Sequence, residues 1–199
     1  MAAVFGGMLV LSGFQGATTK FGVVDRQKAI LTCDLQAKSA DMFQIEYKRR
    51  AELIEFVRTY PVMTEANAKR LRDLFLKASP TANETAELNR LKNEAMDGQK
   101  KYDALSTKTG ISGAEKQQLD ELGRRAGLIS RLLQEWSGQL SDELNQLQTK
   151  YGNDIADKVN AAIGEVGKSQ QFTIVFDKVV APYGGNEVTD AVVKATNKK

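Results

Sequence analysis

The segment AIGEVGKS, Ala162 to Ser169, comes nearest to a chemical motif, because it ends in Gly-Lys-Ser as phosphate-binding loops do. Such a loop follows a strand and opens a helix, so that N–H groups of the first helical turn point at the phosphates. Here a long helical pattern precedes the segment and a strand pattern follows it. We therefore interpret Gly167 as the C-cap of a helix, with Lys168 beside the negative end of its dipole. Neither this segment nor the turn at Gly184-Gly185 predicts a nucleotide or other cofactor site.

The side chains that most often carry catalysis or hold metals are scarce in this chain. It has no histidine and a single cysteine, Cys33. One cysteine cannot form an intramolecular disulfide or a cysteine-cluster metal site, and we interpret Cys33 as a small buried packing residue. No carboxylate pair stands in a recognisable strand-end setting. We therefore assign no catalytic, cofactor-binding or metal-binding residue and expect a protein that is not an enzyme.

Most of the chain predicts long helices. An apolar stripe of Leu, Trp, Tyr, Ile and Val runs from Leu128 to Val166 with a step of about 3.8 residues. This step is above the 3.6 of a straight helix and further still from the 3.5 of a leucine zipper, so it predicts a straight or slightly right-handed pairing. Two capping boxes predict helix starts, Thr81 with Glu84 and Ser112 with Glu115. They follow breaks near 80 and 110, and a weaker break lies at Tyr60-Pro61.

The lengths between these breaks favour a helical hairpin. Residues 26–79 and 114–167 each hold 54 residues, at most about 80 Å of helix. We expect two matched antiparallel legs, with residues 80–113 inserted at the far end as a short extra helix. In the alternative, the chain turns only once, in a loop at Gly110. The first leg is then longer than the second, and a bend at Pro61 has to take up the extra residues. Either way, the sequence predicts an arm over residues 34–167.

Strand patterns near the two chain ends predict a small body of residues 20–33 and 168–199. The segment FTIVFD from Phe172 alternates as a half-buried strand does, and FGVVD from Phe21 is its available partner, expected to run antiparallel to it. A turn cluster from Pro182 to Asn186 follows, and Thr189 is expected to N-cap a final helix. So small a body buries little apolar surface and leaves strand edges open, so we expect it to self-associate. The residues assigned to this oligomerisation body are Val23, Val24, Phe172, Ile174, Phe176 and Tyr183.

The last segment resembles the C-terminus of the OmpH/Skp family of periplasmic chaperones, and FGVVDRQKAI from Phe21 resembles the family's first strand and helical turn. The matching positions are Val175, Asp177, Lys178, Tyr183 to Asn186, Val188 to Asp190 and Val192 to Lys194. The resemblance implies an α+β, mostly α fold, with a long coiled-coil-like α-helical hairpin on a small β body. It also implies a periplasmic homotrimer whose arms enclose unfolded outer-membrane β-barrel proteins without ATP. No client-contact residue can be named from it.

Two further features bear on location and partners. Residues 1–19 are expected to be a signal peptide, because Ala2 to Phe14 is apolar or small and too short to span a bilayer. Residues 48–133 carry 17 basic and 12 acidic side chains, whereas residues 134–166 carry 2 and 6. A basic outer arm suits acidic unfolded chains or an anionic lipid surface. Its basic clusters are too dispersed to predict a nucleic-acid site.

Two alternatives to the chaperone remain open from the sequence. A structural coiled-coil adaptor of the cell envelope would use the same trimer to bind one folded partner. A basic helical protein that binds nucleic acid or lipid would show affinity that falls steeply with salt.

Overall fold

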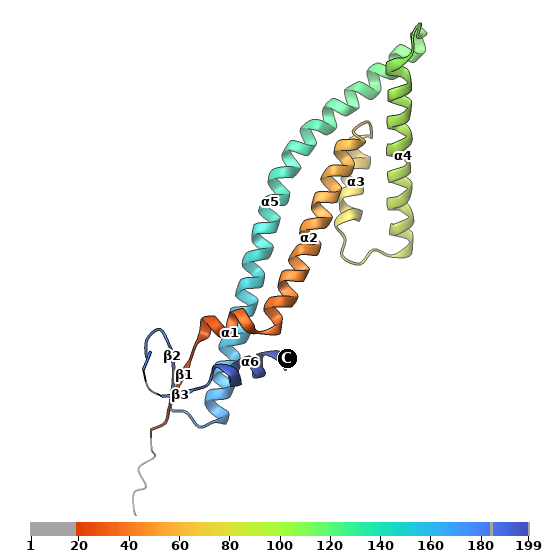
Figure 1. Ribbon diagram of the computed structural model, residues 1–199. Helices are drawn as coiled ribbons and strands as arrows, with labels where there is room; N and C mark the ends of the chain where they lie inside the picture. Colours follow the sequence, from red (N-terminus) through yellow and green to blue (C-terminus); the bar gives the residue numbers. More distant parts are fainter. Residues whose placement is uncertain (1–18, 184, 199) are drawn as a thin grey trace, which may run out of the picture. The chain divides into compact units, whose positions relative to one another are not determined.

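The computed structural model describes residues 19–183 and 185–198, which form two compact units. The predicted signal peptide therefore lies outside the described residues apart from Thr19. We call residues 19–33 and 156–198 the body and residues 34–155 the arm, whereas the sequence placed the second boundary at 167/168. The predicted class, mostly α with a small sheet, is confirmed. In chain order the elements are β1 (Phe21–Val24), α1 (Arg26–Thr32), α2 (Asp34–Thr59), α3 (Glu65–Leu76), α4 (Ala82–Thr107), α5 (Gly113–Ser169), β2 (Ile174–Asp177), β3 (Asn186–Glu187) and α6 (Thr189–Asn197) (Figure 1).

The body contains a three-stranded sheet in the order β2-β1-β3, and both pairings are parallel. The predicted antiparallel pairing is therefore wrong. The hairpin argument ended the returning helix at Gly167, but α5 runs on to Ser169 and the chain then reverses. The N–H of Phe172 donates to the Gly167 carbonyl at 2.9 Å and that of Gln171 to the Lys168 carbonyl at 3.2 Å, with Gln171 at φ 57°. This Schellman reversal lets β2 start at the same end of the sheet as β1.

Three other local predictions need correction. Gly167 does not cap α5 but lies within its last turn. Thr189 is the first residue of α6 instead of its N-cap, and its hydroxyl accepts a 2.7 Å hydrogen bond from the Asp25 N–H while donating to the Glu187 carboxylate. The first helix is interrupted at Cys33, which caps α1 in an extended conformation. Cys33 itself is buried, as predicted.

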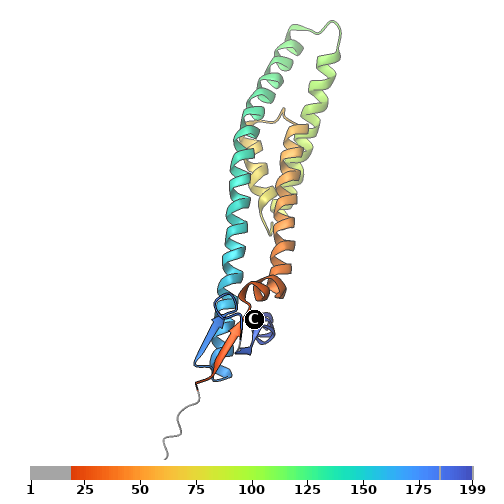
Figure 2. The same cartoon turned by 60° about the vertical axis from the view of Figure 1, so that its left-hand side comes forward.

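The arm has one more reversal than the matched-leg prediction allowed. Figures 1 and 2 show α3 folding back beside α2, α4 reversing the direction of the chain again and α5 reversing it once more. The inserted-tip version is therefore wrong, and Pro61 absorbs the excess length as the alternative expected. The physical reason lies in the turn after α2, where Val62 and Met63 are buried. Ala68, Leu71 and Leu74 then give α3 a buried face of its own.

One hydrophobic core joins the four helices of the arm, and a second, smaller cluster contains Val62, Leu105 and Leu122. The larger core includes Leu53 on α2, Leu71 on α3 and Leu91 on α4, with Trp136 and Leu140 from α5. The prediction that the Leu128–Val166 stripe is a buried face of the helix is thus confirmed for part of its length. Leu132, Trp136, Leu140 and Ile155 are buried, while Leu144, Leu147 and Tyr151 are only half-buried.

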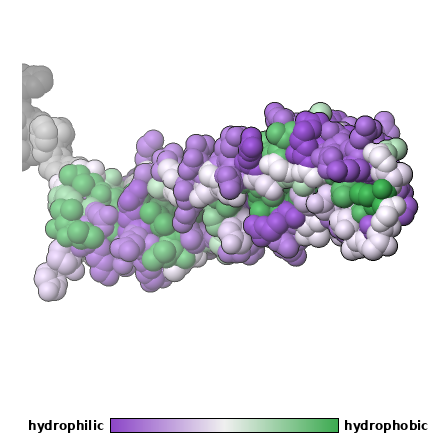
Figure 3. Space-filling view, turned by 90° about the horizontal axis from the view of Figure 1, so that it is seen from above, coloured by the Kyte–Doolittle hydropathy of each residue, from purple (hydrophilic) through white to green (hydrophobic). Residues whose placement is uncertain are grey.

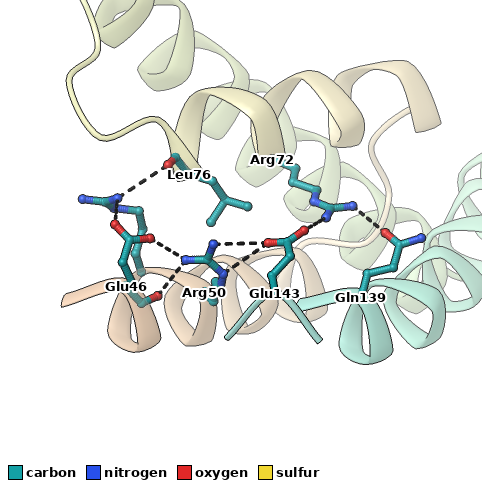
Figure 4. A network of polar contacts seen from close by, with 7 residues as sticks. Glu46, Arg50, Arg72, Leu76, Gln139 and Glu143 are labelled. Atoms are coloured by element: carbon teal, nitrogen blue, oxygen red, sulfur yellow. Dashed lines mark hydrogen bonds and ion pairs between the residues drawn. The ribbon is translucent and has the colours of Figure 1, made fainter. Parts of the chain in front are cut away.

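A polar network also links α2, α3 and α5 (Figure 4). The Glu143 carboxylate accepts from Arg72 at 2.8 Å and from Arg50 at 3.2 Å. Arg50 also donates to Glu46, and Arg72 donates to Gln139 at 2.8 Å. The Arg50 side chain is only 11% exposed, so its charge depends on these acceptors.

Both predicted capping boxes are present, and each is closed by a lysine from the preceding helix end. The Thr81 N–H donates to the Glu84 carboxylate and the Ser112 N–H to the Glu115 carboxylate, each at 2.9 Å. In return, the N–H of each glutamate donates to the hydroxyl of the capping residue. Lys77 binds Glu84 at 2.6 Å, and Lys108 binds Glu115 at 2.5 Å. The bond from Lys77, with that from the Thr81 backbone, lowers the pKa of Glu84 to about 2. Lys108 and the Ser112 backbone likewise lower the pKa of Glu115 to about 2.

Glu143→Gln should lower the free energy of unfolding by about 1–2 kcal/mol, because two arginines lose a charged acceptor. Urea titration followed by the fluorescence of Trp136, which lies in the same core, would measure the change. The matched control is Asp142→Asn, an exposed neighbour whose side chain makes no hydrogen bond in the described structure, which should change stability by less than about 0.5 kcal/mol. Equal losses in the two variants would contradict the assignment.

Acid should weaken both helix starts. Because the folded-state pKa of Glu84 and Glu115 is lowered from 4.5 to about 2, their contribution is present above pH 4.5 and is lost as the pH falls toward 2. Glu84→Gln with Glu115→Gln should therefore show a smaller drop in melting temperature between pH 5 and 2 than the parent, followed by circular dichroism. An unchanged drop in the double variant would show that other carboxylates dominate, and Asp120→Asn serves as the exposed control.

Candidate functional site

The six residues assigned to the oligomerisation body fall into two groups. Val23 and Val24 are buried within the single chain, and Phe172 and Phe176 are half-buried. Ile174 is 47% exposed and Tyr183 is 94% exposed. The strand β2 begins at Ile174, two residues later than the alternation suggested. The exposed members are the ones available to another molecule.

One face of the sheet carries the exposed apolar side chains. Phe21 lies opposite Ile174 and Val23 opposite Phe176, and residues in register on neighbouring strands share a face. The rings of Phe21 and Phe176 stand 5.8 Å apart. Val175 lies on the other face, where its Cγ2 is 3.4 Å from the place that a Cβ on Gly167 of α5 would take. Thus α5 covers one face of β2, while Ile174 stays exposed on the other.

The sheet also has open edges. In the order β2-β1-β3, β2 and β3 each have only β1 as a strand neighbour among the described residues. Val179 and Val180, in the loop after β2, are largely exposed. We call Phe21, Ile174, Val179, Val180 and Tyr183 the sheet surface. Open strand edges next to exposed apolar side chains are features that association with another chain covers.

A second surface lies within the arm, between α2 and α5. A groove of about 320 Å³ is lined by four residues of each helix, and we call it the α2–α5 groove. Its lining is Gln36, Ser39, Ala40, Phe43, Gln148, Tyr151, Gly152 and Ile155. Nearby on α2, Met42, Ile45 and Tyr47 are exposed. Figure 3 shows the character of one face of the molecule, where apolar side chains reach the surface in separate patches among hydrophilic ones.

Sequence reasoning did not find this groove and named no client-contact residue. The available signal was the i, i+3, i+4, i+7 spacing of uncharged residues in Gln36–Phe43 and in Gln148–Ile155. The sequence could not show whether these faces close against each other. The structure leaves them apart.

The described residues present surfaces for binding. Lys168 and Ser169 stand in the last turn of α5, at its carboxyl end, which is the wrong end of a helix for phosphate. No group of three or more acidic or cysteine side chains in the described ranges could hold a metal ion. Likewise, none of the helices described is long and apolar enough to cross a membrane.

A protein-family model described as Outer membrane protein (OmpH-like) matches residues 20–195, which include both units. No curated protein and no solved structure that was compared matches the chain.

Replacing Gly185 tests how the sheet is closed. Gly185 has φ +99°, and a Cβ there would lie 2.7 Å from Cγ2 of Val23. Gly185→Ala should therefore lower the free energy of unfolding of the body by about 2 kcal/mol, through backbone strain and displacement of β3 from β1. Thermal unfolding and faster hydrogen exchange at the β1 amides would measure it.

The matched control is Gly138→Ala. This exposed glycine of α5 has open space where a Cβ would be added. Helix propensity predicts a gain of about 1 kcal/mol, the opposite sign. If Gly185→Ala were neutral, the tight packing of this turn on Val23 would be refuted.

Proposed function

The chain belongs to the OmpH-like outer membrane protein family, and on this premise we propose that it is a periplasmic chaperone for outer membrane proteins. In this proposal the protein is a homotrimer that holds unfolded β-barrel proteins between its arms and prevents their aggregation. It acts as a holdase, without ATP. The observation that carries the proposal is the joining of a small open-edged sheet to a long helical arm that carries a separate apolar groove.

The sheet surface supports self-association. A three-stranded sheet with two short helices and the last turns of α5 is a small core for an independent domain. Its exposed Ile174, Val179 and Tyr183 and its open strand edges would be covered by further copies of the chain. A trimer is the state that the family resemblance implies.

The arm supports client holding. At 57 residues, α5 is about 85 Å long. The α2–α5 groove and the exposed side chains of Met42, Ile45 and Tyr47 offer uncharged contact area for unfolded segments. The basic excess of residues 48–133 would draw acidic unfolded chains, or an anionic lipid surface, toward the arm.

Holding an unfolded chain requires binding without a chemical step. Weak contacts spread over several arms give high avidity when the sites share one client chain. The client can then leave without nucleotide hydrolysis, because each contact exchanges independently.

The test is size-exclusion chromatography with light scattering, using the protein without residues 1–19 and a urea-denatured outer-membrane β-barrel protein. We expect a trimer mass, a shift to the mass of trimer plus client, and loss of aggregation at a ratio near one trimer per client. A uniform trimer that leaves aggregation unchanged would overturn the proposal. Capture of one folded protein without binding of unfolded chains would support the envelope adaptor instead.

A pair of variants tests the sheet surface in the same assay. Ile174→Lys places a charge on the exposed face of β2 and should shift the mass toward monomer. Leu31→Lys is the matched control, since Leu31 is also an exposed apolar residue of the body but lies on α1. A trimer that survives Ile174→Lys, or one that Leu31→Lys breaks equally, would move the interface elsewhere.

A further inference from the structure

The lining of the α2–α5 groove has a regular geometry. Each helix contributes residues at i, i+3, i+4 and i+7, so one face of α2 is turned toward one face of α5. Three of the four middle positions are small, Ser39 and Ala40 on α2 and Gly152 on α5, and the fourth is Tyr151. A Cβ added at Gly152 would meet no atom within 4 Å. Small residues on facing helices normally permit close approach, but here they leave depth that is not filled from within the arm.

The walls of this groove are aromatic and aliphatic. Phe43 and Tyr151 are half-buried, and Ile155 is buried. None of the eight lining residues carries a charge, although 27% of the chain is charged. An aromatic ring from another molecule could pack edge-to-face or offset-stacked against Phe43 and Tyr151. A charged side chain would find no partner among the lining residues and would lose hydration.

Two amides stand among these apolar groups. The side chains of Gln36 and Gln148 make no hydrogen bond in the described part of the chain. An amide side chain both donates and accepts, so it matches a peptide group of any sequence. Such amide groups suit a site that binds the polypeptide backbone whatever its side chains are.

The size of the groove limits what fits. Seven helical residues span about 10 Å, which is about three residues of an extended chain. A volume of about 320 Å³ lies at the small end of ligand pockets. It suits one large side chain with a peptide group on either side, and it is too short for a helix from another protein.

We propose that the α2–α5 groove binds one aromatic side chain of an extended, uncharged segment of unfolded polypeptide. The ring inserts between Phe43 and Tyr151 above Ser39 and Gly152, and the flanking peptide groups bond to Gln36 and Gln148. The proposal rests on the proposed holdase function and names the client feature that it selects. Strands of outer-membrane barrels fit this feature, because they alternate apolar and polar residues and carry aromatic residues at both membrane interfaces.

The experiment measures binding of two blocked, uncharged octapeptides of alternating Thr and Ala to the assembled protein by calorimetry. One peptide has a central Tyr and the other has Ala there. We expect the Tyr peptide to bind at least 10-fold more tightly. Gly152→Leu, which fills the groove from α5, and Ala40→Leu, which fills it from α2, should each weaken the Tyr peptide at least 10-fold. Gly127→Leu is the matched control on α5, because Gly127 is exposed in open space, and should leave binding unchanged.

Cross-linking locates the peptide. With p-benzoylphenylalanine at the central position, we expect adducts within residues 36–43 and 148–155. Adducts elsewhere, or equal binding of the Tyr and Ala peptides, overturn the groove proposal even if the protein still suppresses client aggregation. Loss of trimer mass in both groove-filling variants would also overturn it, by showing that a second copy of the chain occupies the groove. Failure of the parent protein to suppress aggregation would instead count against the holdase function itself.

Discussion

The structure depends on one unbroken helix. α5 supplies Trp136 and Leu140 to the core of the arm and buries Val159 and Val166 in the body. No proline occurs between Gly113 and Ser169, and the apolar stripe holds a period near that of a straight helix. A single helix, α5, contributes to both units, and it is preceded in the arm by three helices, α2, α3 and α4. These three helices can all pack along α5 only if the chain reverses direction between them. The back-fold of α3 is how it does so.

The features that could be predicted are those with local causes. The capping boxes at Thr81 and Ser112 act over three residues, and both are present with their glutamates bound. The strand at Ile174 follows from alternation, although it begins two residues later than the pattern suggested, and the break at Pro61 follows from proline sterics. Each of these signals is complete within a short window of sequence, so no tertiary information was needed.

The features that were missed have distant causes. The direction of β2 depends on the two residues after α5, where Gln171 takes a left-handed conformation. A glycine at that position would have indicated the reversal in the sequence, but a glutamine does not. The back-fold of α3 depends on the burial of Val62 and Met63, which the sequence shows only as an apolar pair. The α2–α5 groove depends on faces that do not close, and residue spacing describes a face but not its separation from another. β3 is two residues long and gives no alternation at all.

The sheet pairing has a consequence for how the molecule forms. Lys20 and Gln170, which meet at the start of the paired strands, are 150 positions apart, whereas Lys77 and Glu84, or Lys108 and Glu115, are seven apart. Loop closure makes distant contacts slow and near ones fast. The contacts at the helical turns of the arm should therefore form faster than the strand pairing of the body. A chain that stopped between the end of α5 and the start of β2 would hold all the helices of the arm but lack β2 and β3, the two strands that pair with β1.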